Sequence, residues 1–231
     1  MKKIIASILI LTSLVYATNG DMNGKKHMKM FQSVPVSKAI ILQKGKAKMF
    51  CSICGMTLPM FYRTNHAATS KTHTKQYCSI HCLMEDKIKN GANLKNIRVV
   101  DNKTLKFIDV HDATYVVGSS KKGTMSMKSK YAFAKKRDAV KFADKFGGKV
   151  MNYAQTSEIA KKGLAKEMAM ISKKQAKMAK KGKMIYHKMC KKTKLKFISI
   201  ADAKAFVKES KICGNLSGKK LQAVGLYLGR R

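Results

Sequence analysis

Between residues 49 and 155 the apolar positions switch repeatedly between the two-residue period of a strand and the 3.6-residue period of a helix. Gly91 and the pair Gly147-Gly148 stand where the two predicted helices end. This pattern predicts a duplicated α+β module with halves at 49–102 and 103–155. The expected strands are 57–64, 72–77, 97–101, 105–110, 114–118, 130–134 and 149–153, and the expected helices are 78–90 and 135–146.

Residues 156–181 do not continue the alternation of strand and helix patterns. In this segment lysine, alanine and methionine dominate and proline is absent. Such a composition predicts a long exposed helix or helical linker. Its methionines, Met168, Met170 and Met178, could form a copper-binding ladder. We interpret them instead as an apolar stripe, since Met168 and Met178 are not three or four positions apart.

The last segment, residues 182–231, carries three short apolar helical faces and predicts a small all-α unit. Cys190 and Cys213 both fall in this segment. We expect them to form a disulfide that joins its first two helices, because a unit this small gains much from such a link.

Residues 1–17 have the layout of a secretory signal: two lysines, an apolar run and the small residue Ala17. The run is short for a membrane span, although an uncleaved anchor or a buried helix is the alternative interpretation. We therefore expect export to the bacterial periplasm. No cysteine stands at the end of this run, so no lipid anchor is expected. Residues 18–48 are polar and basic, and they predict a flexible arm.

The chain is extremely basic, with 49 Lys and Arg against 12 Asp and Glu and a formal net charge of +37. Nearly all of the excess is lysine spread along the chain, and there is no tryptophan. Since nucleic-acid binding favours arginine and stacked aromatic rings, we expect no nucleic-acid function. Weak, salt-sensitive association with anionic membrane surfaces is expected instead. No catalytic triad, paired-carboxylate set or phosphate-binding loop stands out, which predicts a non-catalytic protein.

Four of the six cysteines form two close pairs, Cys51-x-x-Cys54 and Cys78-x-x-x-Cys82. Gly55 lets the chain turn back after the first pair. The second pair begins a predicted helix, whose free N–H groups stabilise thiolates. On spacing alone, a structural zinc site with four cysteine ligands is the default. The same spacing also suits a disulfide within each pair or a thiol–disulfide oxidoreductase, although no thioredoxin-like βαβ pattern surrounds the motif.

Soft donors beside these thiols shift the prediction towards copper. Thioethers and imidazoles lie within or near both pairs, and Cu(I) prefers thiolate, thioether and imidazole ligands at low coordination number. Export also disfavours four free thiols reserved for zinc, because oxidation competes. We favour Cu(I), with zinc as the alternative, and the candidate ligands are Cys51, Cys54, Met56, Cys78, His81, Cys82, Met125 and Met127.

Several motifs occur in an order that resembles the NosL family, accessory proteins for the copper centres of nitrous oxide reductase. The resemblance covers about residues 48–155. It implies a periplasmic Cu(I) metallochaperone built from two treble-clef-like ββα halves. Cys51 and Cys54 match the family's Cys-x-x-Cys-Gly-Met, and Met125 matches its copper-associated methionine. The motifs are Cys51-Ser-Ile-Cys-Gly-Met56, the Tyr77-Cys78 step, Tyr115-Val-Val-Gly-Ser119, Gly123-Thr-Met125, Tyr131-Ala-Phe-Ala and Phe146-Gly-Gly-Lys-Val150.

The chain departs from the family in two ways: members are commonly lipoproteins, and they usually lack a C-terminal extension. The extension faintly resembles a small cytochrome c, but Cys190 is followed by Lys-Lys-Thr-Lys, so no covalent haem is expected. We expect Cys51 and Cys54, with Met125 or a nearby soft donor, to hold Cu(I) in a shallow site. The ion would pass by ligand exchange to a periplasmic copper enzyme such as nitrous oxide reductase. The alternative is a zinc-bound structural adaptor with a basic surface.

Overall fold

The computed structural model describes residues 30–231 of the 231-residue chain. The predicted signal at 1–17 and the start of the predicted arm at 18–29 lie outside the described residues. Within residues 30–231, no helix combines the length and the apolar character that a membrane crossing requires.

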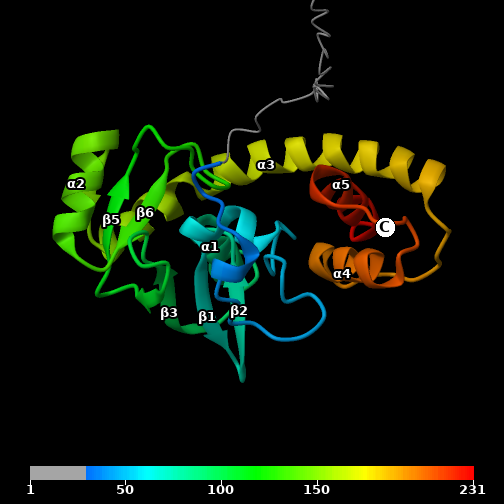
Figure 1. Cartoon of the computed structure of the whole chain (residues 1–231), viewed down its shortest axis with the longest axis horizontal. Helices are drawn as coiled ribbons and strands as arrows, with labels where there is room; N and C mark the ends of the chain where they lie inside the picture. The colour runs from blue at the N-terminus through cyan, green and yellow to red at the C-terminus, as the bar shows by residue number, and fades with distance from the viewer. Residues whose placement is uncertain (1–29) are drawn as a thin grey trace, which may run out of the picture.

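The first half is a four-stranded antiparallel sheet with one helix, and its strand order is β2-β1-β3-β4 (Figure 1). The side chain of Asp101 accepts hydrogen bonds from the backbone of Lys103 and Thr104 and tightens the turn between β3 and β4. The first half therefore extends past the expected boundary at residue 102. Its elements are the 3-10 helix η2 (Leu58–Thr64), β1 (His66–Ser70), β2 (His73–Tyr77), α1 (Ile80–Ile88), β3 (Leu94–Val100) and β4 (Phe107–Asp109).

The strand predicted at 57–64 is wrong, because these residues form η2. Pro59 lies at the start of this helix, where its missing N–H would be unpaired in any case. In a strand the same proline would remove a ladder hydrogen bond. The partner of β2 is instead β1, which pairs with it in register from His66 opposite Tyr77 to Ser70 opposite His73.

The second half is a three-stranded antiparallel sheet of order β6-β5-β7, packed against one helix. A bridge between Asp101 and Ala132 connects the two sheets. Small antiparallel sheets with separate helices confirm the predicted α+β class. The elements are β5 (Thr114–Val117), β6 (Lys130–Phe133), α2 (Lys136–Phe146) and β7 (Lys149–Met151).

Residues 30–48 lie against the two halves and include a short 3-10 turn, η1 (Val36–Lys38). The ring of Phe31 packs edge-on against Tyr131 and near Phe142 of α2. The side-chain carbonyl oxygen of Gln43 accepts a hydrogen bond from the backbone of Gln76, at 2.8 Å. The prediction of a flexible arm is therefore wrong for residues 30–48, because apolar burial and hydrogen bonds to β2 fix this segment.

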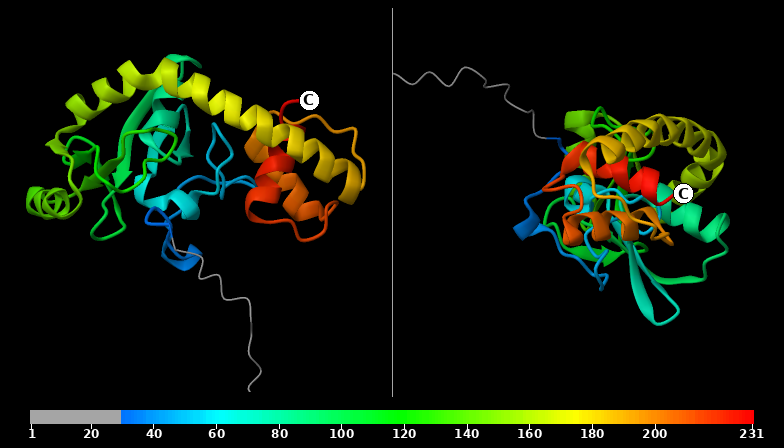
Figure 2. Two further views of the ribbon diagram at one scale, coloured as in Figure 1. Left: turned by 90° about the horizontal axis from the view of Figure 1, so that it is seen from above. Right: turned by 90° about the vertical axis from the view of Figure 1, so that its right-hand side faces the viewer.

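One long helix, α3 (Tyr153–Met189), runs from the second half of the molecule to the C-terminal helices (Figures 1 and 2). Its start is fixed by a capping box in which Asn152 and Gln155 exchange side-chain hydrogen bonds with each other's backbone. The helix expected at 156–181 is confirmed, because these residues all lie in α3. Its expected exposure is wrong on one side, because Leu164 is buried against the first half and α3 packs along α5. The helix also continues beyond residue 182, where a new unit was expected to begin.

The C-terminal segment adds α4 (Ile200–Ser210) and α5 (Gly218–Leu228). Cys190, directly after α3, forms a disulfide with Cys213, in the loop after α4. Around this disulfide the apolar side chains of all three helices form one buried cluster, which Phe50 joins from the first half. The C-terminal helices are thus packed onto the body of the molecule close to the Cys-Gly-Met turn.

Candidate metal centre

The first cysteine pair lies on a tight turn that the backbone closes on itself. The backbone N–H of Gly55 donates to the carbonyl of Cys51, and the N–H of Cys51 donates to the carbonyl of Met56. Gly55 has a positive φ of +68°, which an L side chain rarely adopts. Its missing Cβ also leaves room for Ile200 of α4, which would otherwise lie 2.5 Å away.

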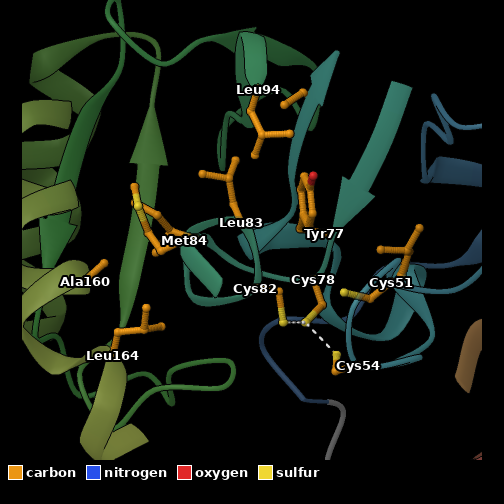
Figure 3. Close-up of a cluster of buried hydrophobic side chains, with 13 residues drawn as sticks. Cys51, Cys54, Tyr77, Cys78, Cys82, Leu83, Met84, Leu94, Ala160 and Leu164 are labelled. Carbon is orange, nitrogen blue, oxygen red and sulfur yellow. Dashed lines mark hydrogen bonds between the residues drawn. The ribbon is translucent and has the colours of Figure 1, made fainter. Parts of the chain in front are cut away.

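The second pair lies where strand β2 passes into helix α1. Cys78 directly follows the strand, and Cys82 lies in the first turn of the helix. All four thiol sulfurs lie within 4.8 Å of one another and are buried (Figure 3). The distance between the sulfurs is 3.5 Å for Cys54 and Cys78 and 3.6 Å for Cys78 and Cys82.

This spacing fits one metal ion in the middle of the four sulfurs. A tetrahedral ion with metal–sulfur bonds of about 2.3 Å holds its sulfurs roughly 3.8 Å apart. None of the four cysteines is in a disulfide, so the alternative of disulfides within each pair is not observed. The group of Cys51, Cys54, Cys78 and Cys82, called the thiol cluster below, therefore has the composition and size of a metal site.

The thiols also influence one another's protonation. Burial alone would raise the pKa of Cys51, but hydrogen bonds from the other three thiols outweigh it and hold that pKa well below its usual range. The pKa values of Cys78 and Cys82 are raised, first because each of them donates towards Cys51. Cys51 thus loses its proton easily, whereas Cys78 and Cys82 keep theirs. Because a metal ion binds thiolates, its binding at this cluster must release these protons.

Two side chains from the C-terminal helices reach the backbone of the cysteine turn. Lys204 of α4 donates to the carbonyl of Gly55 and to the side chain of Gln222. Gln222 of α5 donates in turn to the carbonyl of Cys54, at 3.0 Å. Burial lowers the pKa of Lys204 to about 8, and the nearby Cys54 and Cys51 partly offset that shift. Sequence reasoning missed both residues, because a single lysine in so basic a chain gives no signal.

His81 does not join the thiol cluster, contrary to its place among the candidate ligands. Its Nδ1 lies 3.0 Å from a carboxylate oxygen of Glu167 on α3, and its Nε2 faces Glu85 at 3.8 Å. Adjacent residues on a helix project about 100° apart. When Cys82 points to the thiols, His81 therefore points to α3.

Glu167 also accepts a hydrogen bond from Ser126, in the loop before β6. Burial would raise the pKa of Glu167, but the hydrogen bonds from His81 and Ser126 outweigh it and lower that pKa. A charged carboxylate on α3 thus links helix α1 to the loop that carries the predicted methionines.

The three candidate methionines lie beside the thiol cluster rather than inside the group of four. Met56 and Met125 are partly buried against the apolar cluster that contains the thiols. Met127 is 75% exposed. All three line one cavity of about 510 Å³, together with Met170 and Met178 of α3. The interpretation of Met170 and Met178 as a simple apolar stripe missed this shared cavity.

Residues 43–161 match the family model described as NosL. This chain belongs to the NosL family. The resemblance seen in the sequence motifs is thereby confirmed. The expectation of a non-catalytic protein agrees with membership of this family. The thiol cluster, Met56, Met125 and Met127 lie inside the matched segment, whereas most of α3 and all of α4 and α5 lie outside it.

Among solved structures, the chain is similar to the crystal structure of the copper chaperone NosL from Shewanella denitrificans. The two are 24% identical, and the similarity covers 53% of this chain and 94% of the other, with a TM-score of 0.39. No curated protein matches this chain. This chain is thus a member of the NosL family in which four buried thiols lie close enough together to hold a metal ion.

Proposed function

We propose that this protein is an exported Cu(I) chaperone that carries its ion in the thiol cluster. The observation that carries the proposal is the convergence of four free, buried sulfurs within 4.8 Å, inside the segment that matches NosL. Thiolates select Cu(I) over hard cations. The buried ammonium group of Lys204 beside the turn partly balances the negative charge that thiolates bring to the interior.

The thiol cluster is buried, and this corrects the expectation of a shallow site. Cys54 is 2% exposed, and it borders a cavity of about 120 Å³ that Met168 and Arg230 also line. In the proposed handover, a ligand of the recipient enters through this cavity and bonds to the ion before the last thiolate leaves. Cys54 is therefore the thiolate from which transfer starts.

Two features support export and an acidic recipient. The first 17 residues have the layout of a secretory signal, and the chain is rich in lysine. A basic surface raises the rate of encounter with an acidic patch on a partner. We propose an exported copper enzyme as recipient, with nitrous oxide reductase as the first to be tested. The same lysines give weak, salt-sensitive binding to anionic membranes.

A structural zinc site is the second candidate, and the complete burial of the thiol cluster favours it. Structural zinc sites are closed and have four protein ligands, whereas an ion in transit needs an open position. In this alternative the thiols hold Zn²⁺ permanently, and the chain serves as an adaptor through its basic surface.

Metal analysis of the mature chain, purified without oxygen, separates the two candidates. The Cu(I) proposal predicts that the thiol cluster takes up one equivalent of Cu(I) in competition with a chromophoric chelator. Cys54→Ser should weaken that binding by more than the roughly 10–100-fold that loss of a ligand's outer partner causes. Ser52→Ala, a neighbouring change outside the four ligands, is the control. Stoichiometric zinc that Cu(I) does not displace would overturn copper carriage by the thiols.

A further inference from the structure

The loop that joins α3 to α4 holds apolar side chains in solvent. Ile198 is 100% exposed, and Leu195 in the same loop is 53% exposed. Single exposed apolar residues are ordinary on a protein surface, so the surroundings decide whether these two have a role. Figure 1 shows that the loop runs along the end of the molecule that lies away from the two sheets. Residues 191–199 are called the α3–α4 loop below.

The backbone of this loop is fixed by its neighbours. The N–H of Thr193 donates to the hydroxyl of Tyr186, at 2.7 Å. The guanidinium group of Arg231 donates to the carbonyls of Thr193 and Leu195, at 3.1 and 2.9 Å. Phe197 packs against the buried cluster of the C-terminal helices. The fold therefore buries one apolar residue of the loop and presents two others to solvent in a defined backbone conformation.

The sequence around the loop is basic and contains no acidic residue. Residues 168–201 include eleven lysines and neither aspartate nor glutamate. Within the loop, the exposed side chains of Lys194 and Lys196 stand on either side of Leu195. Lysine can lay its apolar stem along an apolar surface while its ammonium group reaches outwards. Lysines interleaved with exposed aliphatic residues are typical of segments that lie on a membrane surface.

A basic groove of about 310 Å³ lies beside the loop. It is adjacent to the loop because Arg231, which lines the groove, donates to the loop backbone. The chain has only five arginines, and two of them line this groove. Guanidinium groups match the oxygens of a phosphate with paired hydrogen bonds. The described residues that line the groove include no acid; its basic members are Lys180, Lys183, Arg230 and Arg231.

These features favour a lipid surface over a protein partner. Protein interfaces are depleted in lysine, and a stable one buries about 800 Å² of closely packed surface on each partner. Two projecting aliphatic side chains between lysines do not offer such an area. A bilayer needs only that these side chains enter among the headgroups, and anionic lipids attract each lysine or arginine near the surface.

We propose that the α3–α4 loop and the basic groove form a docking surface for anionic phospholipid membranes. Leu195 and Ile198 enter the interface between headgroups and acyl chains, and the groove receives a lipid phosphate. The proposal rests on the membrane association given under the proposed function, which it locates on one surface, and it does not depend on the metal. Because Arg230 lines both the groove and the cavity that borders Cys54, docking brings that cavity close to the membrane.

Insertion of the loop can be measured directly, because the chain contains no tryptophan. Ile198→Trp places a single fluorophore in the mature chain at a fully exposed position. Vesicles in which about a third of the lipid is phosphatidylglycerol should shift its emission to the blue, and lipids brominated in their acyl chains should quench it. Val140→Trp, on α2 at the opposite end of the molecule, is the control and should show neither effect (Figure 1). An unchanged emission of Ile198→Trp would overturn the proposal.

Sedimentation with the same vesicles then measures the contribution of the loop to affinity. Leu195→Ser/Ile198→Ser should weaken binding by roughly tenfold or more, because two side chains no longer leave water. The loss should persist at high salt. Val140→Ser is the matched control and should bind like the parent. The uptake of Cu(I) by the thiol cluster should be unchanged in the loop variant, so a failure of docking leaves copper carriage untouched.

Charge in the groove is tested by Lys180→Gln/Lys183→Gln. Each lysine near an anionic surface contributes about fivefold, so the pair should weaken binding by about 25-fold at low salt and far less at high salt. Lys136→Gln/Lys141→Gln on α2 removes the same charge from exposed positions and is the control.

The outcomes separate this surface from its rivals. If the loop and groove variants bind vesicles like the parent, attraction by the lysines in general stands and the docking surface is refuted. A parent chain that does not bind anionic vesicles at low salt refutes both. If polyglutamate, an acidic polypeptide, shifts the emission of Ile198→Trp and the vesicles do not, the surface belongs to an acidic protein partner and the lipid proposal is refuted.

Discussion

Two glycines of α3 should respond in opposite ways to the same substitution. Gly182 lies where α3 meets α5, and a Cβ there would be 1.9 Å from the carbonyl oxygen of Ala223. Gly163, on the same helix, would place its Cβ no closer than 3.7 Å to the side chain of Glu167. Gly182→Ala therefore drives two backbones apart, and Gly163→Ala meets only ordinary van der Waals contact.

The size of each effect follows from these distances. A carbon and an oxygen in van der Waals contact lie about 3.3 Å apart, whereas the added Cβ would lie 1.9 Å from the Ala223 oxygen. The helices α3 and α5 must therefore separate by roughly 1.4 Å. A gap of about that size loses half or more of the dispersion energy between the facing atoms. Overpacking costs about 1–3 kcal/mol, and a clash between backbones belongs at the upper end. Alanine regains about 1 kcal/mol of helix propensity at either position. We expect Gly182→Ala to lose about 2 kcal/mol of unfolding free energy and Gly163→Ala to gain about 1 kcal/mol.

Equilibrium unfolding in urea, with the disulfide intact, measures both changes. A difference of about 3 kcal/mol between the variants corresponds to roughly 6–12 °C in melting temperature for a chain of this size. Hydrogen exchange in α5 should also quicken in Gly182→Ala. If the two variants are equally stable, the close packing of α3 against α5 does not hold in solution, and Leu226 then does not line the cavity of about 510 Å³ beside the thiol cluster.

The remaining predictions concern the disulfide, pH and metal. Replacing Cys190 and Cys213 by alanine removes a cross-link over 23 residues and should lower the unfolding free energy by about 3 kcal/mol, as reduction of that bond in the parent chain should also do. Burial lowers the pKa of His66 to about 4, so the unfolded chain binds the extra proton between pH 6.5 and 4. The free energy of unfolding should fall by about 3 kcal/mol as the pH falls through that window. When it is measured by urea unfolding at several pH values, the free energy of unfolding of His66→Gln should change less with pH. Cu(I) at 100 times its dissociation constant should add about 2.7 kcal/mol to the parent chain, and calorimetry should show much less gain in Cys54→Ser.

Much of the α+β core could be predicted from the sequence, because its strands and helices have clear periods. The expected strand at 114–118 and the expected helix at 135–146 correspond closely to β5 and α2. The failure at 57–64 came from reading strand-forming residues without the effect of Pro59. The spacing of the cysteines in two close pairs likewise predicted a cluster of four thiols, because a turn and a helix start can bring two such pairs together.

Other parts of the site depend on tertiary packing that no local pattern reveals. Cys82 and His81 are neighbours in sequence, yet the helix turns one to the thiols and the other to Glu167. Met170 lines the cavity of about 510 Å³ together with Met125, because the loop that carries Met125 is hydrogen-bonded to α3 through Ser126 and Glu167. Lys204 reaches a carbonyl 149 positions away, and sequence alone cannot pair residues at that separation.

That contact has a practical meaning for anyone who wishes to dissect the protein. The family match ends at residue 161, so a shortened protein that contains only the family segment would be cut there. Such a fragment would lack the donors that Lys204 and Gln222 supply to the carbonyls of Gly55 and Cys54. In this chain α4 and α5 supply hydrogen bonds to the backbone of the candidate metal centre. A fragment that ends at residue 161 would therefore leave these two buried carbonyl groups without their donors.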